Sequence, residues 1–200
     1  MTTSSNAARP TSRPSPRQRL LAAAGDLFYR QGIGAVGVDL VSKAAGVSKR
    51  TMYQQFASKD ELVAASLDEA GEAIMRTYLP PGDLPNSERP AREQILAVFY
   101  AQGDWAGGPE FRGCPFINTA TELPDRQHPA RAVALRYKLR LRDFFAAQAV
   151  RGGSADPQQL ADQLLILFDG AILQSVLGTV RGPDAAVRAV ATLLDAAGVR

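Results

Sequence analysis

The sequence predicts an all-α fold of about nine helices. Apolar residues recur at helical spacing along most of the chain, and no alternating run of useful length predicts a strand. Capping residues, glycines and prolines punctuate these periodic segments, as is typical of helix ends. With 200 residues, of which 46% are hydrophobic and 22% charged, the chain can bury the core of one large domain or two small ones.

Residues 1–16 are rich in Ser, Thr, Pro and Arg and have no periodicity, so we expect a disordered arm. A first helix of about fifteen residues begins at Pro16 and ends before Gly32. A second, short helix spans Val38–Ala45. It stops at Gly46, a residue suited to the left-handed conformation that ends many helices.

The next two helices begin at capping residues. Ser48 is an N-cap that opens a third helix running to about Gln55. Ser58 and Glu61 form a capping box that starts a fourth, long helix to about Tyr78. Further helices are expected over 91–105, 129–151, 157–180 and 184–197, and a stretch interrupted by glycine and proline lies between the first two of these.

The first three helices contain the parts of a helix-turn-helix. The tight turn Ala-Ala-Gly-Val, residues 44–47, joins the second helix to the third. Met52 and Phe56 lie four residues apart and should face inward, against the first helix. The opposite, exposed face would then carry the polar side chains of Lys49, Arg50, Tyr53 and Gln54.

These side chains suit the major groove of DNA. Arginine can pair bidentately with guanine and glutamine with adenine, while lysine or tyrosine can hold a phosphate. Lys59, at the start of the fourth helix, would meet a phosphate together with the free N–H groups there. An ordinary polar helix face is the alternative, and Tyr53 could instead pack on the first helix. Arg9 and Arg13 of the arm could enter a minor groove or belong to a solubilising tail.

The distribution of charge agrees with this interpretation. Residues 1–60 hold nine basic and three acidic side chains, whereas the remaining 140 residues hold fourteen basic and seventeen acidic ones. A basic N-terminal third joined to a mildly acidic remainder indicates a polyanion-binding unit on a body with another task. A solvated basic surface would explain the same asymmetry.

Residues 17–64, above all AAGVSKRTMYQQFASKDELVAA, resemble the DNA-binding domain of TetR-family transcriptional regulators. The resemblance implies a homodimeric repressor whose C-terminal domain, here 65–200, binds a small molecule and thereby releases operator DNA. The sequence departs from the family at Gly37, where Thr or Ser usually binds a phosphate, and at Gln54, where Tyr or His is common. Carried over by position, the resemblance implies DNA contacts from Lys49, Arg50, Thr51, Tyr53, Gln54 and Lys59.

A ligand pocket is expected around the interrupted stretch Phe111–Asn118, which resembles a segment opening the sixth helix in some members of that family. Aromatic side chains surround it, and a concave apolar pocket with one or two polar groups is what a small-molecule site requires. A plain core is the alternative, with Cys114 as a buried small hydrophobe. The expected lining residues are Trp105, Phe111, Cys114, Phe116, Asn118, Tyr137, Phe144 and Phe168.

The last two predicted helices indicate a second subunit. Apolar residues cover most of the circumference of the helix over 160–177, so it must be buried on both sides, one facing the core and the other a partner. A deeply buried helix of a monomer is the alternative. The expected homodimer interface consists of Leu160, Leu164, Phe168, Ile172, Val176, Val187, Val190 and Leu194.

The sequence also excludes several classes of protein. One cysteine, Cys114, permits no intrachain disulfide, and with the single histidine, His128, it cannot build a zinc site, so we expect no metal and no cofactor. Unbroken apolar runs such as Leu164–Phe168 are too short to span a bilayer, and the N-terminus has no secretory signal. We therefore expect a cytoplasmic protein without a membrane partner.

No catalytic constellation accompanies these features. Neither a nucleophile-elbow GxSxG nor a phosphate-binding GxxxxGK[ST] occurs, and Cys114 has no evident base partner. The sequence therefore predicts a ligand-responsive regulator that binds double-stranded DNA and a small molecule, and not an enzyme. A regulator that acts without a ligand or as an activator is the nearest alternative, and an enzyme the remote one.

Overall fold

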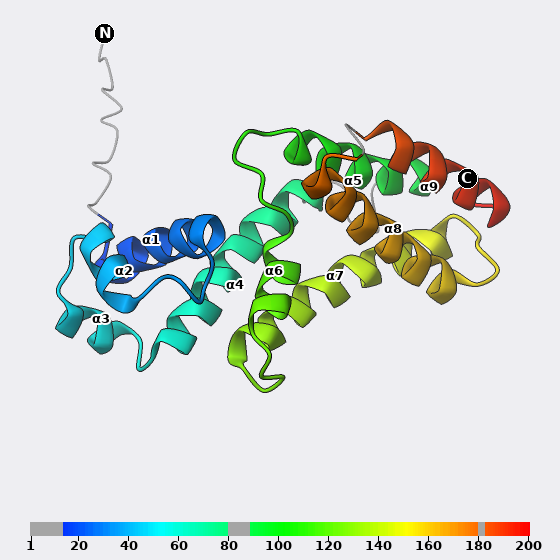
Figure 1. Cartoon of the computed structure of the whole chain (residues 1–200). Helices are drawn as coiled ribbons and strands as arrows, with labels where there is room; N and C mark the ends of the chain where they lie inside the picture. The colour runs from blue at the N-terminus through cyan, green and yellow to red at the C-terminus, as the bar shows by residue number, and fades with distance from the viewer. Residues whose placement is uncertain (1–13, 80–88, 180–182) are drawn as a thin grey trace, which may run out of the picture.

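The computed structural model describes residues 14–79, 89–179 and 183–200, and within these ranges it is all-helical (Figure 1). Most of the predicted arm, residues 1–13 with Arg9 and Arg13, lies outside the described part. In chain order the helices are α1 (Pro16–Gln31), α2 (Val38–Ala44), α3 (Lys49–Gln55), α4 (Lys59–Tyr78), α5 (Ala91–Ala106), α6 (Pro115–Glu122), α7 (Pro129–Arg151), α8 (Pro157–Leu177) and α9 (Asp184–Ala196).

The helix limits that were predicted agree with the structure to within one residue, except at the end of α8, and α6 lies in the interrupted stretch for which no limits were predicted. That helix ends at Leu177, three residues before the predicted limit, because Gly178 adopts a left-handed conformation with φ of 70°. The predicted N-caps hold at α3 and α4, but the capping box at α4 forms only in part, because the Glu61 carboxylate accepts from the Ala57 amide, at 2.7 Å, and not from that of Ser58. The Ser48 hydroxyl accepts from the Thr51 amide at 3.0 Å, and the Ser58 hydroxyl accepts from the Glu61 amide at 3.1 Å.

Helices α1–α3 form a small unit, here called the head, and α5–α9 form the body (Figure 1). The head is held together by side chains that are fully buried, among them Leu20 and Ala24 of α1 and Met52 of α3. Helix α4 packs on α1 and then continues into the body, where it packs on α7. Its twenty residues span roughly 30 Å, so one rigid element connects the two units.

The centre of the body is an aromatic cluster. The ring of Phe99 on α5 stacks on that of Phe145 of α7, with 5.9 Å between the ring centroids. It meets the ring of Phe168 of α8 edge-on, with 5.8 Å between the centroids. The ring of Tyr78, at the end of α4, meets that of Phe168 edge-on, with 5.4 Å between the ring centroids. Such ring pairs contribute beyond their buried area, so this cluster fixes α4, α5, α7 and α8 relative to one another.

The contact between α4 and α7 combines polar and close apolar packing. The Tyr137 hydroxyl lies 3.0 Å from a Glu72 carboxylate oxygen and also donates to Asp68. Hydrogen bonding from Tyr137, and then from Arg136, holds the pKa of Asp68 below its ordinary value. Gly71 lies beneath the ring, where a Cβ atom would come within 2.4 Å of Tyr137 Cε2.

Replacing Gly71 with alanine is expected to destabilise the protein. Alanine favours a helix over glycine by about 1 kcal/mol, but the overlap with the Tyr137 ring should cost roughly 1–3 kcal/mol of unfolding free energy. The matched control is Gly25→Ala on α1, where nothing lies within 4 Å of the added Cβ atom. Urea unfolding at one protein concentration should show a lower midpoint for Gly71→Ala only. An unchanged midpoint would show that α4 and α7 pack less tightly than described.

The structure corrects the predicted face of the dimer helices. Seven of the eight predicted interface residues are buried within their own chain, and Val176 alone of the eight is exposed, at 50%. An apolar pattern that covers the whole circumference cannot show which stripe faces the chain's own core. The buried residues are Leu160, Leu164, Phe168, Ile172, Val187, Val190 and Leu194.

A different stripe of α8 is left without a partner in the described chain. Ile166, Leu173 and Leu177 are 71%, 55% and 64% exposed. Gly170 is also exposed, and the four positions follow one face of the helix. On α9 the residues at the equivalent spacing are small: Ala185, Ala189, Thr192 and Ala196. We call these two stripes the α8–α9 face.

By length and composition alone, α8 could cross a bilayer, which the unbroken-run argument did not anticipate. The same composition is expected of a helix that packs on two sides. One side of α8 packs on α7 and α5, with Leu164 fully buried. The other side of α8 is also apolar, and it is exposed as part of the α8–α9 face.

Candidate nucleic-acid interface and ligand pocket

The turn between α2 and α3 is held by backbone and side-chain bonds. Gly46 has φ of 62°, which lets the Val47 amide donate to the Ser42 carbonyl at 3.0 Å. The Arg19 guanidinium of α1 donates to the carbonyls of Ala45 and Gly46 at 2.8 and 3.0 Å. Sequence reasoning counted Arg19 only as positive charge, whereas here it fastens the turn to α1.

The inner face of α3 docks on α1 as predicted. Met52 and Phe56 are buried, with 0% and 1% of their surface exposed. The Arg17 guanidinium lies 4.4 Å from the centroid of the Phe56 ring and donates to the Gln55 carbonyl at 3.3 Å. Arg17 and Arg19 are therefore positioning residues, which the sequence analysis did not identify. Their partners lie 38 and 26 residues further along the chain, so no local signal in the sequence could have identified them.

The outer face of α3 carries four of the six predicted DNA contacts. Arg50 and Gln54 are exposed and have no hydrogen-bond or ion-pair partner within residues 14–79, 89–179 and 183–200. Tyr53 is 48% exposed and is not among the side chains that pack against the core. Lys49 lies 2.9 Å from Asp39 of α2, and the hydrogen bond to Asp39 raises the pKa of Lys49. A phosphate at Lys49 would therefore compete with Asp39.

Two other predicted contacts have structural partners inside the head. The Thr51 hydroxyl is 2.8 Å from the Ser48 hydroxyl, within the N-cap of α3. The Lys59 ammonium donates to the Ile33 carbonyl at 2.6 Å and lies 5.9 Å from the centroid of the Phe28 ring. Lys59 is half-buried, so contact with a phosphate would require it to leave that carbonyl. Gly37, as expected, supplies no side-chain cap to α2.

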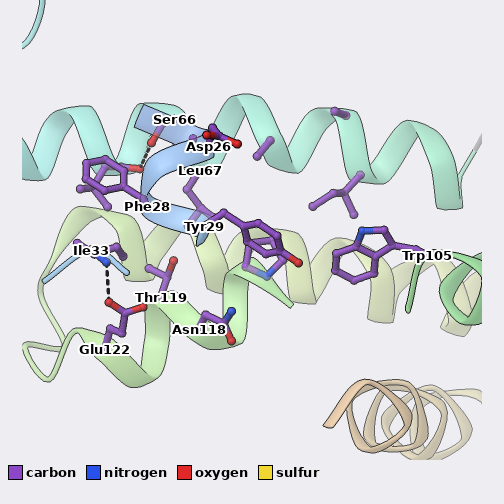
Figure 2. A pocket seen from close by; sticks show the side chains of 16 residues that line it. Asp26, Phe28, Tyr29, Ile33, Ser66, Leu67, Trp105, Asn118, Thr119 and Glu122 are labelled. Atoms are coloured by element: carbon purple, nitrogen blue, oxygen red, sulfur yellow. Dashed lines mark hydrogen bonds between the residues drawn. The ribbon is translucent and has the colours of Figure 1, made fainter. Parts of the chain in front are cut away.

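A cavity of about 340 Å³ lies between α1, α4 and α6, where the head meets the body (Figure 2). Trp105 lies at one end of it and Glu122 at the other. Most of the walls are apolar. The lining residues are Gly25, Asp26, Phe28 and Tyr29 of α1, Ile33 of the following loop, Val63, Ser66, Leu67, Ala70, Ala73 and Ile74 of α4, Trp105 of α5, and Pro115, Asn118, Thr119 and Glu122 of α6.

Only two of the eight predicted pocket residues line this cavity, namely Trp105 and Asn118. The reason is the orientation of α6. Pro115, Asn118 and Glu122 share the face toward the cavity. Phe116 points the other way, and its ring stacks on Tyr137 at 5.1 Å.

The remaining predicted pocket residues belong to the packing around the cavity. The ring of Phe111 packs edge-on against that of Trp105, with 4.8 Å between the ring centroids. The ring of Phe144 packs on that of Phe145, with 5.9 Å between the centroids. A second void of only about 10 Å³ has Cys114, Phe116, Tyr137 and Phe168 in its walls, so those four side chains are close-packed. Burial raises the pKa of the Cys114 thiol, which keeps it protonated and unreactive at neutral pH.

Hydrogen bonds join the head to α6 and to the loop that precedes it. The Glu122 carboxylate accepts from the Ile33 amide at 2.7 Å and from the Gly34 amide at 3.4 Å. The Tyr29 hydroxyl accepts from the Arg112 amide at 2.7 Å and donates to the Gly113 carbonyl at 3.1 Å. A displacement of α6 would therefore stretch or break these bonds, or move the head with it.

Comparison with known proteins places both halves of the chain in one group. Residues 20–66 match the model described as bacterial regulatory proteins, tetR family, and residues 91–191 match the one described as tetracyclin repressor-like, C-terminal domain. The crystal structure of SAV143 from Streptomyces avermitilis is 47% identical, with a TM-score of 0.86, over 94% of this chain and all of the other.

Two relatives differ in the regulation that their names describe. The HTH-type transcriptional repressor Rv3405c of Mycobacterium tuberculosis is 33% identical over 82% of this chain and 90% of its own length. The HTH-type transcriptional activator FasR of Mycolicibacterium smegmatis is 46% identical over 55 residues, which are 28% of this chain and 25% of its own. The chain is thus similar both to a protein named a repressor and to one named an activator.

Proposed function

The chain belongs to the TetR family of DNA-binding transcriptional regulators, and on that basis we propose that it is a homodimeric repressor that a small molecule releases from its operator. Members of this family are regulators and not enzymes. The domain limits 17–64 and 65–200, the DNA contacts and the ligand response are all parts of the proposal. Support for repression comes from Rv3405c, the relative named a repressor that is similar over most of both chains.

The observation that carries the proposal is the two-sided character of α3. Its inner face is fixed by Met52 and Phe56, while Arg50 and Gln54 project from the other side without partners in the described chain. A helix so fixed can enter a major groove with its side chains in a set register. In this proposal Arg50 pairs with guanine, Gln54 pairs with adenine, and Tyr53 holds a phosphate.

The α8–α9 face supports the homodimer. Isolated exposed leucines are ordinary, but Ile166, Leu173 and Leu177 form a continuous stripe along α8, and small exposed residues follow one face of α9. Two helices from each subunit would make a four-helix interface around a two-fold axis. Two copies of α3 related by that axis would bind a near-palindromic operator.

The cavity and the bonds around it support a ligand response. A small molecule that prefers one spacing of α1 and α6 would shift the position of the head, but only by as much as its affinity differs between the two arrangements. Helix α4 extends this coupling into the body, because Arg140 and Tyr137 of α7 contact Glu72 at 3.0 Å. Ligand binding and DNA binding are therefore expected to oppose each other.

The salt dependence of operator binding tests the DNA-binding part of the proposal. With roughly four phosphate contacts per subunit, the slope of log affinity against log salt concentration should be about −7 for a dimer. The measurement is a titration of a selected operator fragment at several salt concentrations. A slope near zero would show that the basic head does not bind phosphates. In a reporter strain, loss of the protein should raise expression from that operator, and reduced expression would instead show an activator.

A further inference from the structure

The lining of the cavity has an unbalanced charge. Its sixteen residues include two carboxylates, Asp26 and Glu122, and no lysine, arginine or histidine. Asp26 is already compensated, because Arg30 lies 2.6 Å from it. Glu122 has no ion-pair partner in the described part of the chain, and its bonds there are to the amides of Ile33 and Gly34. Among the lining residues, Glu122 therefore carries the one charge without an ion-pair partner. The cations nearest to it in the described chain already bind backbone carbonyls outside the lining: Lys59 binds that of Ile33, and Arg131 binds those of Ala120 and Leu123.

The other walls favour a hydrocarbon. Phe28, Leu67 and Trp105 supply apolar surface from the Glu122 end to the opposite end (Figure 2), and Ile74 also lines the cavity. A volume of about 340 Å³ is within the usual range for small-molecule sites. An anionic ligand would bring a like charge to Glu122 with no cation in the lining to receive it, whereas a protonated amine would gain a charge-assisted hydrogen bond.

We propose that this cavity binds a small apolar amine, with its hydrocarbon body against Trp105 and α4 and its ammonium group on the Glu122 carboxylate. This rests on the proposed ligand response and deepens it by naming the chemical class of the ligand. The ammonium would compete with the Ile33 and Gly34 amides for Glu122. Because those amides lie in the loop that leads into α2, binding would loosen the attachment of the helix-turn-helix to α6.

Three matched probes test this class directly: 4-phenylbutylamine, 4-phenylbutanol and 4-phenylbutanoate. Trp105 is the single tryptophan of the chain and lines the cavity, so its fluorescence reports occupancy without any label. In the full chain without DNA, the amine should bind about tenfold more tightly than the butanoate, with the alcohol between them. Equal affinities, tighter binding of the butanoate, or no response to any of the three would overturn the proposal.

Two variants locate the contacts. Glu122→Gln removes the charge but keeps an oxygen that can accept from the Ile33 amide, and it should bring the amine to within about threefold of the alcohol. Asp125→Asn, an exposed acid beyond the end of α6, is the matched control and should leave the preference unchanged. Ala70→Phe, which fills the cavity from α4, should abolish the response to the amine even if Glu122→Gln fails to fold. A preference for the amine that survives Glu122→Gln, or a response that survives Ala70→Phe, would place the binding elsewhere.

The two proposals fail in different ways. The probe titrations contain no DNA, so they decide the chemical class of the ligand alone. If the amine binds as expected and the operator complex is unaffected, the ligand class holds and the proposed release from DNA is wrong. If other compounds release the operator while the amine does not bind, the release holds and the ligand class is wrong.

Discussion

Replacing Leu173 with glutamate is expected to convert a dimer into a monomer and to lower operator affinity by at least about a hundredfold. Leu173 is 55% exposed at the middle of the α8–α9 face. Across a two-fold axis, each substitution would bring two unpaired carboxylates into an apolar contact, where burying a charge without a partner costs several kcal/mol. A monomer would present one α3 to DNA instead of two.

Light scattering at micromolar concentration measures the mass, and an operator titration measures the affinity. The matched control is Leu135→Glu on α7, which changes a side chain that is 59% exposed outside the α8–α9 face. It should remain dimeric and bind the operator as the parent does. A monomeric Leu135→Glu protein together with a dimeric Leu173→Glu protein would place the interface on α7 instead. If the parent protein has the mass of one chain, the proposed homodimer is wrong.

Replacing Arg50 with alanine is expected to weaken operator binding and to change its sequence preference. A bidentate contact to guanine contributes about 1–3 kcal/mol of discrimination, and a dimer would lose two such contacts. The side chain is exposed and has no partner in the described chain that the substitution would disrupt, so the fold of the head should be retained. The titration is repeated on operators with each base pair of a half-site altered.

Lys49→Ala is the matched control on the same turn of α3. Lys49 pairs with Asp39 and is expected to act on phosphate, so its loss should weaken binding to every operator by a similar factor. Arg50→Ala should instead flatten the preference at one base pair of each half-site. If Arg50→Ala also weakened all operators equally, Arg50 would be a phosphate contact.

Local sequence signals predicted the helices and the helix-turn-helix, because those features depend on neighbouring residues. Ser48 and Ser58 cap the helices that follow them, and the spacing of Met52 and Phe56 indicates the buried side of α3. Each such signal lies within one turn or one helix. The limits of α1–α5, α7 and α9 follow from them almost completely.

Contacts between distant segments were not accessible in the same way. Arg19 bonds to a turn 26 residues away, and Glu122 bonds to a loop 89 residues away. The apolar residues of α8 were identified as a partner helix, yet which stripe faces the core depends on how α8 packs on α7. The cavity likewise depends on the rotation of α6 about its own axis. That rotation directs Phe116 to Tyr137 and Asn118 to the cavity beside the head.

The central claim, that two copies of α3 read one symmetric site, is tested most directly by selecting bound fragments from random DNA. The parent protein should enrich a near-palindrome whose two halves occupy successive major grooves on one side of the duplex. The same selection with Arg50→Ala protein should lose one preferred base pair symmetrically from both halves. Enrichment of a single asymmetric sequence, or of none, would contradict the account.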